Sequence, residues 1–149
     1  MWQFIPDIFM LSSRIKVNLS YVLPGCTLTI TWKGIPVFIK NRTLTEITLS
    51  RLTKINDLKD KLARNENIKS NALAFDRNRC INRLSTNWLV LLAPCTHLGC
   101  IPEIKICGWY CSCHGSIYDN VGRILKGPAP YNLKIPKCSI KLNYLTIVD

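Results

Sequence analysis

The sequence predicts an all-β fold: an antiparallel β sandwich with a small metal-binding subdomain and one short helical insertion. Residues 14–23 and 26–32 alternate polar and apolar side chains, as half-buried strands do. Turn signals separate the apolar runs, first at Pro24-Gly25 and again at Lys33-Gly34. One segment, beginning at Thr43, carries a clear helix start signal.

The first elements follow from these signals in order. Residues 26–32, Lys33-Gly34 and residues 36–40 predict a β-hairpin. Thr43 with Glu46 three residues later has the form of a capping box, which predicts a helix through about Arg51. Its spacing predicts one apolar face, formed by Leu44, Ile47 and Leu52.

The later elements are shorter. Residues 53–64 could extend the helical structure, and the polar stretch 65–87 predicts a long irregular surface connection. Trp88 to Leu92 and Trp109-Tyr110 predict strands that lead into two cysteine-containing loops at the ends of neighbouring strands. Residues 132–135 and 138–148 predict the closing strands.

Residues 95–118 contain the candidate metal-binding residues. They read Cys-Thr-His-Leu-Gly-Cys, ten further residues, and then Cys-Ser-Cys-His-Gly-Ser-Ile-Tyr. The chain has two histidines, His97 and His114, and both lie here, each just after a cysteine, Cys95 and Cys111. Two thiolates and two imidazoles on two short loops predict a mixed sulfur and nitrogen metal site. A structural zinc module is the simpler alternative, but it leaves one surplus cysteine in each loop, Cys100 and Cys113.

The pattern resembles the two boxes of the Rieske iron–sulfur subunit of ubiquinol–cytochrome c reductases, of the alphaproteobacterial and mitochondrial type. In a Rieske 2Fe–2S centre, two histidines replace two cysteines on one iron, which raises the potential to about −150 to +300 mV. The resemblance implies Cys95 and Cys111 on one iron, and His97 and His114 on the other. It also implies a disulfide between Cys100 and Cys113, with a closed loop worth roughly 3 kcal/mol.

The same resemblance assigns roles to two hydroxyls. Ser116 and Tyr118 match positions whose hydroxyls hydrogen-bond a bridging sulfide and a ligand sulfur, which stabilises the reduced cluster. Residues 122–130 match a third cluster-covering loop, with Gly127 to Pro130 as its rigid part. Residues 32–43 resemble the cytochrome bc type and not the plastoquinol-oxidising type. The ten residues between the boxes are fewer than the family usually has.

The resemblance also implies a domain plan and a set of partners. Residues 1–13 are expected to be a hinge segment without the family's usual membrane helix, residues 14–149 the Rieske domain, and about 93–131 its cluster-binding subdomain. Expected partners are ubiquinol, cytochrome b and a c-type cytochrome subunit, with His114 and His97 as the catalytic pair. Membrane attachment would come through these partners or through a missing helix. The expected location is the periplasmic side of a bacterial inner membrane or the intermembrane-space side of a mitochondrial one.

Length and composition limit the number of domains and the kinds of partner. The 149 residues suffice for one domain, and the longest apolar run, Trp2 to Leu11, is interrupted by Pro6-Asp7 and is too short to span a bilayer. The charge of +11 is scattered, with no basic cluster beyond 77–79, so no nucleic-acid partner is expected. Cys26 and Cys138 are expected in the core, and Cys107 to be a bystander. A soluble Rieske ferredoxin is the main alternative function.

Overall fold

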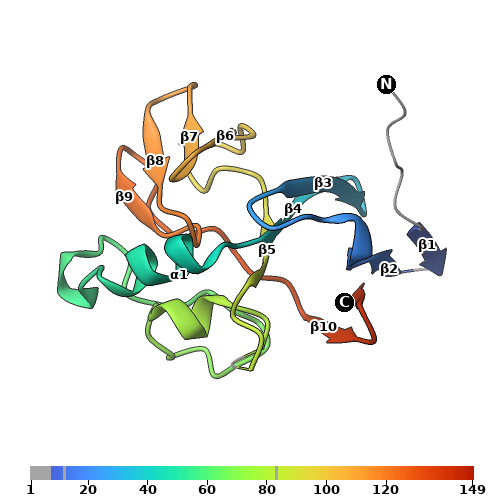
Figure 1. The fold of residues 1–149 in the computed structure, drawn as a ribbon. Coiled ribbons are helices and arrows are strands. Elements are labelled where there is room, and N and C mark those ends of the chain that lie inside the picture. Colours follow the sequence, from blue (N-terminus) through green and yellow to red (C-terminus); the bar gives the residue numbers. More distant parts are fainter. Residues whose placement is uncertain (1–7, 12, 83) are drawn as a thin grey trace.

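The computed structural model describes residues 8–11, 13–82 and 84–149. Within these residues the chain forms three antiparallel sheets and one α-helix (Figure 1). The all-β prediction is therefore confirmed. Part of the segment expected to be a hinge, residues 1–7 and 12, lies outside the described residues, and residues 8–11 form the first strand.

The first sheet joins the two ends of the described chain. Its strand order is β1-β2-β11-β10, with bounds β1 Ile8–Leu11, β2 Arg14–Asn18, β10 Cys138–Lys141 and β11 Tyr144–Ile147. Only the first half of the strand predicted over 14–23 forms, because a 3₁₀ turn at Leu19–Tyr21 follows β2. The closing strands predicted over 138–148 are confirmed as the β10–β11 hairpin.

The second sheet consists of β3 (Thr27–Trp32), β4 (Ile35–Asn41) and β5 (Trp88–Leu92). It is buried on both faces along β4 and β5, whereas its edge strand β3 is partly exposed. Lys33 and Gly34 both have positive φ, 51° and 74°, as a two-residue hairpin turn requires, and the predicted hairpin is confirmed. Val90 packs with the core against the first sheet, whereas Leu89 and Leu91 pack with the core of the third. This double burial explains why β5 is uniformly apolar instead of alternating.

The first cysteine-containing loop leads from β5 into the third sheet, and the second connects two strands of that sheet. The strand order of the third sheet is β6-β7-β8-β9, with bounds β6 Glu103–Lys105, β7 Gly108–Cys111, β8 Ser116–Tyr118 and β9 Ile124–Lys126. Trp109 and Tyr118 are buried, and the Trp109 ring stacks on Phe38 of β4 with centroids 5.6 Å apart. The two loops follow β5 and β7, which lie in different sheets, so the prediction that they end neighbouring strands was wrong.

Helix α1 spans Leu44–Arg51 and begins with the predicted capping box. The Glu46 N–H donates to the Thr43 hydroxyl (3.2 Å), and the Thr43 N–H donates to the Glu46 carboxylate (2.8 Å). The predicted apolar face was wrong: Leu44 and Leu52 are exposed, and the buried positions are Ile47 and Ser50. Ser50 faces inward because its carbonyl and hydroxyl oxygens accept hydrogen bonds from the buried guanidinium of Arg123.

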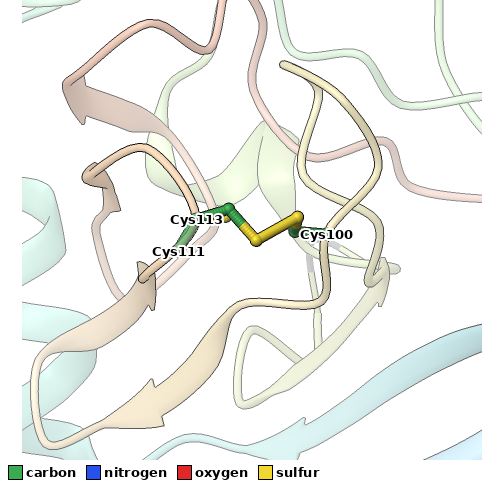
Figure 2. A group of neighbouring side chains, drawn as sticks. All are labelled: Cys100, Cys111 and Cys113. Carbon is green, nitrogen blue, oxygen red and sulfur yellow. A yellow bond between two sulfur atoms is a disulfide. The ribbon is translucent and has the colours of Figure 1, made fainter.

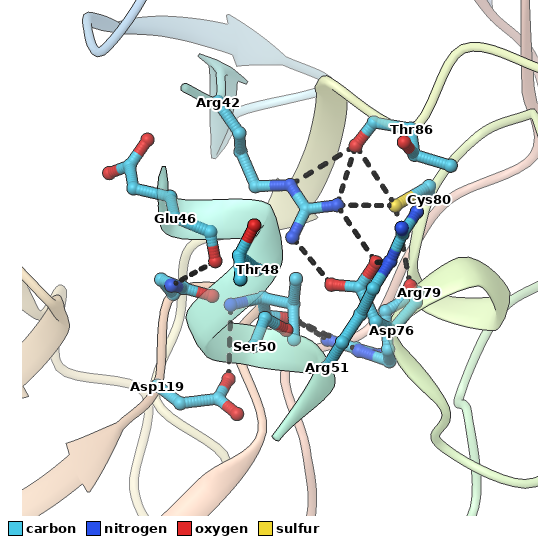
Figure 3. A network of polar contacts seen from close by, with 12 residues as sticks. Arg42, Glu46, Thr48, Ser50, Arg51, Asp76, Arg79, Cys80, Thr86 and Asp119 are labelled. Atoms are coloured by element: carbon cyan, nitrogen blue, oxygen red, sulfur yellow. Dashed lines mark hydrogen bonds and ion pairs between the residues drawn. The ribbon is translucent and has the colours of Figure 1, made fainter. Parts of the chain in front are cut away.

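The long connection between α1 and β5 is irregular, as predicted, but it is not confined to the surface. The possible helical extension over 53–64 amounts to a single 3₁₀ turn at Ile55–Asp57, and a second turn lies at Asp76–Arg79. Buried ion pairs hold the segment in place, above all the one between Arg42 and Asp76, which Figure 3 shows beside Cys80 and Thr86.

Arg79 is the second polar anchor of this connection. It is fully buried and donates to the carbonyls of Ala63, Val121, Gly122 and Leu133. Burial lowers its pKa to about 10. These side-chain hydrogen bonds take the place of strand pairing in this part of the fold. Residues 132–135 form one isolated bridge, between Asn65 and Ile135, so the prediction of a strand there was wrong.

Among the described residues, no helix has the length and apolar character needed to cross a lipid bilayer.

Candidate metal centre

The two loops at the edge of the third sheet are built alike. In the first, the Gly99 N–H donates to the Cys95 carbonyl, and in the second the Gly115 N–H donates to the Cys111 carbonyl, both at 2.9 Å. Gly99 and Gly115 have φ of +85° and +82°, a region that glycine enters without steric cost. Each loop is thus a tight turn that begins at a cysteine, ends at a glycine and carries its histidine between them.

The two imidazoles meet although they come from separate loops. The ring centroids of His97 and His114 lie 4.7 Å apart, and the ring planes are 88° to each other. His114 is exposed and His97 partly exposed. Nδ1 of His97 is nevertheless buried and has no hydrogen-bond partner among the described residues. A buried ring nitrogen without a partner is available as a metal ligand.

The two thiols of the motif, unlike the rings, lie in the core that packs against the third sheet. Cys95 and Cys111 are 3% and 2% exposed, and neither forms a disulfide. Cys100 and Cys113 do form one, with Cα atoms 6.6 Å apart, which ties the two loops together. The Cys111 sulfur lies within 4.8 Å of both sulfurs of this bridge (Figure 2). Because those two sulfurs are bonded to each other, Cys111 is the member of this group that can bind a metal.

The surroundings of Cys95 favour its thiolate. Burial alone would raise the pKa of Cys95, but hydrogen bonds from the Tyr118 hydroxyl, the His97 backbone, Cys111 and Ser116 together lower it. The pKa of Cys111 is raised by burial and by its contact with Cys95. Burial and the contact with Cys95 also raise the pKa of Tyr118, which therefore stays protonated. The 3.2 Å contact between the Tyr118 hydroxyl and the Cys95 sulfur is thus donated by the tyrosine.

Tyr118 and Ser116 share one hydrogen-bonding arrangement. The Tyr118 oxygen accepts from the Thr96 N–H at 3.1 Å and donates to Cys95. The Ser116 oxygen accepts from the Ala129 N–H at 3.1 Å, and the Ser116 hydroxyl is among the groups that lower the pKa of Cys95. In both cases a backbone N–H occupies the hydroxyl oxygen and leaves the hydroxyl proton for the sulfur. Such donors stabilise negative charge on a ligand sulfur.

The donor set fits a binuclear iron–sulfur cluster. Two buried thiols would hold an inner iron, and two imidazoles at the surface, one with a buried unpartnered nitrogen, would hold an outer iron. A four-ligand zinc site would need these same residues, but it gives the two sulfur-directed hydroxyls no role.

The sequence analysis did not identify two groups that take part in the hydrogen bonds of the candidate metal centre. Thr96, between the two ligands of the first loop, joins that loop to Tyr118 and accepts the Tyr131 N–H at 3.2 Å. Its place inside the motif was the signal that could have identified it. The Ala129 amide had no signal, because its role depends on how the third loop, residues 122–130, packs.

The remaining cysteines lie outside the centre. Cys138 is buried, as predicted, but Cys26 is exposed, so its assignment to the core was wrong. Cys107 is a free, exposed residue in the two-residue turn that joins β6 to β7. That turn lies within the ten residues that connect the two boxes. Cys80 is buried beside Arg42, and burial raises its pKa to about 11.

Comparisons with known proteins show the family of this chain. The Rieske [2Fe-2S] domain matches residues 52–137. The ubiquinol-cytochrome c reductase iron-sulfur subunit of Cereibacter sphaeroides is 47% identical over 128 residues, which cover 83% of this chain and 68% of that protein.

A plant relative and a solved structure extend the match. The mitochondrial cytochrome b-c1 complex subunit Rieske-4 of Nicotiana tabacum is 43% identical over 136 residues, covering 89% of this chain and 51% of that protein. The chain therefore spans about half the length of this relative. A chain from a hyperthermophilic respiratory complex III superposes with a TM-score of 0.52 and 26% identity, covering 87% of this chain and 71% of that one.

Proposed function

The chain belongs to the Rieske [2Fe-2S] family, among the iron–sulfur subunits of ubiquinol–cytochrome c reductase, and we propose that it is the electron-transferring head of such a complex. The observation that carries this proposal is the contact between the rings of His97 and His114, from two loops that each also bear a buried thiol, Cys95 and Cys111.

The cofactor is a 2Fe–2S cluster of the Rieske type. Cys95 and Cys111 would hold one iron, and His97 and His114 the other. When bound, the cluster supplies a one-electron acceptor whose potential lies above that of all-cysteine clusters, because neutral imidazoles replace two anionic thiolates.

His114 is the residue placed to meet the substrate. Its imidazole is exposed, whereas the thiols below it are not, so a quinol could hydrogen-bond this ring without entering the core. An imidazole whose second nitrogen faces solvent can take up and release a proton near neutral pH. We therefore assign proton acceptance from ubiquinol to His114, with His97 as the other member of the catalytic pair. On this assignment the chain acts as a catalytic subunit only within its complex.

The surface around the imidazoles suits a transient contact. Leu98 is 72% exposed beside His97, and Pro128 and Pro130 are exposed in the neighbouring third loop. Exposed apolar residues that rim a few polar groups mark interaction sites. We propose that this rim docks at the quinol pocket of cytochrome b, and that the head then moves to a c-type cytochrome subunit. Residues about 93–131 would be the part that docks, and residues 1–13 the hinge.

The proposed location follows from the disulfide and from the membrane complexes to which the relatives belong. A stable disulfide requires an oxidising compartment. The head would therefore face the periplasm of a bacterium or the intermembrane space of a mitochondrion.

Electron paramagnetic resonance of the purified chain, followed by a redox titration, tests the proposal. We expect the spectrum of a cluster with mixed sulfur and nitrogen ligation and a potential in the upper part of the Rieske range. A potential well below zero would favour the soluble ferredoxin, and zinc without iron would favour the structural module.

A further inference from the structure

The loop formed by Gly127 to Pro130 is seated directly on the second ligand loop. Gly127 has φ of +98°, and a Cβ atom there would lie 2.5 Å from the Ser116 Cα and 2.8 Å from the Gly115 carbonyl oxygen. Two residues further on, the Ala129 N–H donates to the Ser116 hydroxyl at 3.1 Å. The position of this loop therefore decides what the Ser116 hydroxyl can bind.

The loop has few means of holding its own shape. Pro128 and Pro130 have no N–H, so only Gly127 and Ala129 can donate from its backbone. The Ala129 N–H is already committed to Ser116. The carbonyl groups of the loop therefore need hydrogen-bond donors from another segment to keep the loop in place.

Lys59 supplies that hold. Its ammonium donates to the carbonyls of both Gly127 and Ala129, each at 2.8 Å. One cation thus bridges the two residues that flank Pro128. Hydrogen bonds from an ionised donor are stronger than those between neutral groups.

Lys59 is itself held in position by its neighbour. The Asp60 carboxylate, in a residue only 5% exposed, accepts the Asn132 N–H at 2.9 Å, and the Asn132 amide donates back to the Asp60 carbonyl at 3.0 Å. The Arg64 guanidinium binds the same carboxylate. The segment that carries Lys59 is therefore fastened to the end of the same loop, so the lysine is not a freely moving surface side chain.

We propose that Lys59 is a positioning residue of the metal centre. It holds the backbone of Gly127 and Ala129 so that the Ala129 amide occupies the Ser116 oxygen and the Ser116 proton points to the ligand sulfur. This role rests on the proposed function. Without Lys59 the loop lifts, the Ser116 hydroxyl turns away from the sulfur, and the reduced form of the centre loses a stabilising donor.

The test compares four cluster-loaded proteins: wild type, Lys59→Met, Lys59→Arg and Lys61→Met. Methionine removes the charge and both donors, whereas arginine keeps them. Lys61 is an exposed lysine two residues away, so its replacement removes the same charge without touching the loop. We expect a lower reduction potential for Lys59→Met, and values close to wild type for Lys59→Arg and Lys61→Met.

Amide exchange supplies a readout that does not depend on the potential. Within the loop from Gly127 to Pro130, only Gly127 and Ala129 have a backbone amide that can exchange, and Ala129 alone lies between the two prolines. We expect the Ala129 amide to exchange about tenfold faster in Lys59→Met, as the loss of roughly 1.4 kcal/mol from local opening predicts, and to be unchanged in Lys61→Met.

The possible outcomes distinguish failure of the role of Lys59 from failure of the proposed function. If wild type has the Rieske spectrum and Lys59→Met matches it in potential and exchange, Lys59 has no positioning role and the proposed function stands. Equal potential shifts in Lys59→Met and Lys61→Met without faster exchange would mean a simple charge effect and would also overturn the inference. If wild type itself has no such spectrum, both proposals fall.

Discussion

The imidazole rings of His97 and His114 stand nearly perpendicular, with centroids 4.7 Å apart, although each belongs to a different loop. In the same two loops, the thiols of Cys95 and Cys111 are almost completely buried. The candidate centre is therefore asymmetric, because its imidazoles reach the surface and its thiols are enclosed. The proposed coupled transfer of an electron and a proton depends on this asymmetry.

Tyr118→Phe is expected to lower the reduction potential. The hydroxyl that it removes donates to the Cys95 sulfur and accepts from the Thr96 amide. We take this hydrogen bond to be about 1.4 kcal/mol stronger in the reduced form of the centre than in the oxidised form. Its loss would then lower the one-electron reduction potential by about 60 mV. A redox titration followed by electron paramagnetic resonance measures the shift. Tyr110→Phe, on the exposed side of β7, is the matched control and should leave the potential unchanged.

Ser116→Ala should act in the same direction. It removes the second hydroxyl that lowers the pKa of Cys95 and leaves the buried Ala129 amide without its acceptor. We expect a lower potential, slower quinol oxidation in the assembled complex, and a stability loss of about 1–3 kcal/mol from the unpaired amide. Ser112→Ala changes an exposed hydroxyl in the same loop and serves as the control. A Ser116→Ala protein with the wild-type potential would refute the proposed donor role.

Removal of the disulfide should loosen the centre. Cys100 and Cys113 lie 13 residues apart in sequence, so the chain-entropy relation gives about 3 kcal/mol of stabilisation. We expect the double variant Cys100→Ser with Cys113→Ser to unfold at lower urea concentration and to lose iron faster during dialysis. Cys107→Ser, which changes an exposed free cysteine, should match the wild type. Iron retention equal to wild type in the double variant would show that the loops hold together without the bridge.

The buried ion pair between Arg42 and Asp76 should make stability fall in acid. Burial alone would raise the pKa of Asp76, but the hydrogen bond and charge of Arg42, with help from Ser50 and Arg51, lower it overall. A carboxyl whose pKa is lower in the folded state stabilises the fold above its unfolded pKa of about 3.9. That stability is lost as the pH falls through the lower folded pKa.

Chemical unfolding as a function of pH tests this relation. We expect the free energy of unfolding of the wild type to decline below about pH 4. Asp76→Asn should be less stable by about 3–5 kcal/mol at neutral pH, because it leaves Arg42 buried and unpaired, and its decline in acid should be shallower. Asp57→Asn, an exposed carboxyl in the same connection, is the control. Parallel pH curves for wild type and Asp76→Asn would contradict the assigned role.

Features that depend on neighbouring residues could be predicted well. The hairpin turn at Lys33-Gly34 and the capping box at Thr43 and Glu46 are local, and both form as expected. The two ligand loops are also local, because each is a five-residue turn closed by its own glycine. The pairing of Cys100 with Cys113 came from family resemblance, and the structure contains it.

Features that depend on contacts between distant parts of the chain could not be predicted from the sequence. The buried face of α1 is set by Arg123, which binds Ser50 from a turn far along the chain. The connection before β5 looked like a polar surface segment, yet Arg79 is fully buried within it, since several carbonyls from other segments surround its guanidinium.

The sequence by itself determined which residues are the candidate ligands and the two short turns that carry them, because these follow from residue type and short-range spacing. Only the tertiary structure decided which carbonyls Lys59 would bind and which amide would occupy the Ser116 oxygen. The Lys59 contacts join segments about 70 residues apart in the chain, and the geometry of all three contacts exists only once the sheets have packed.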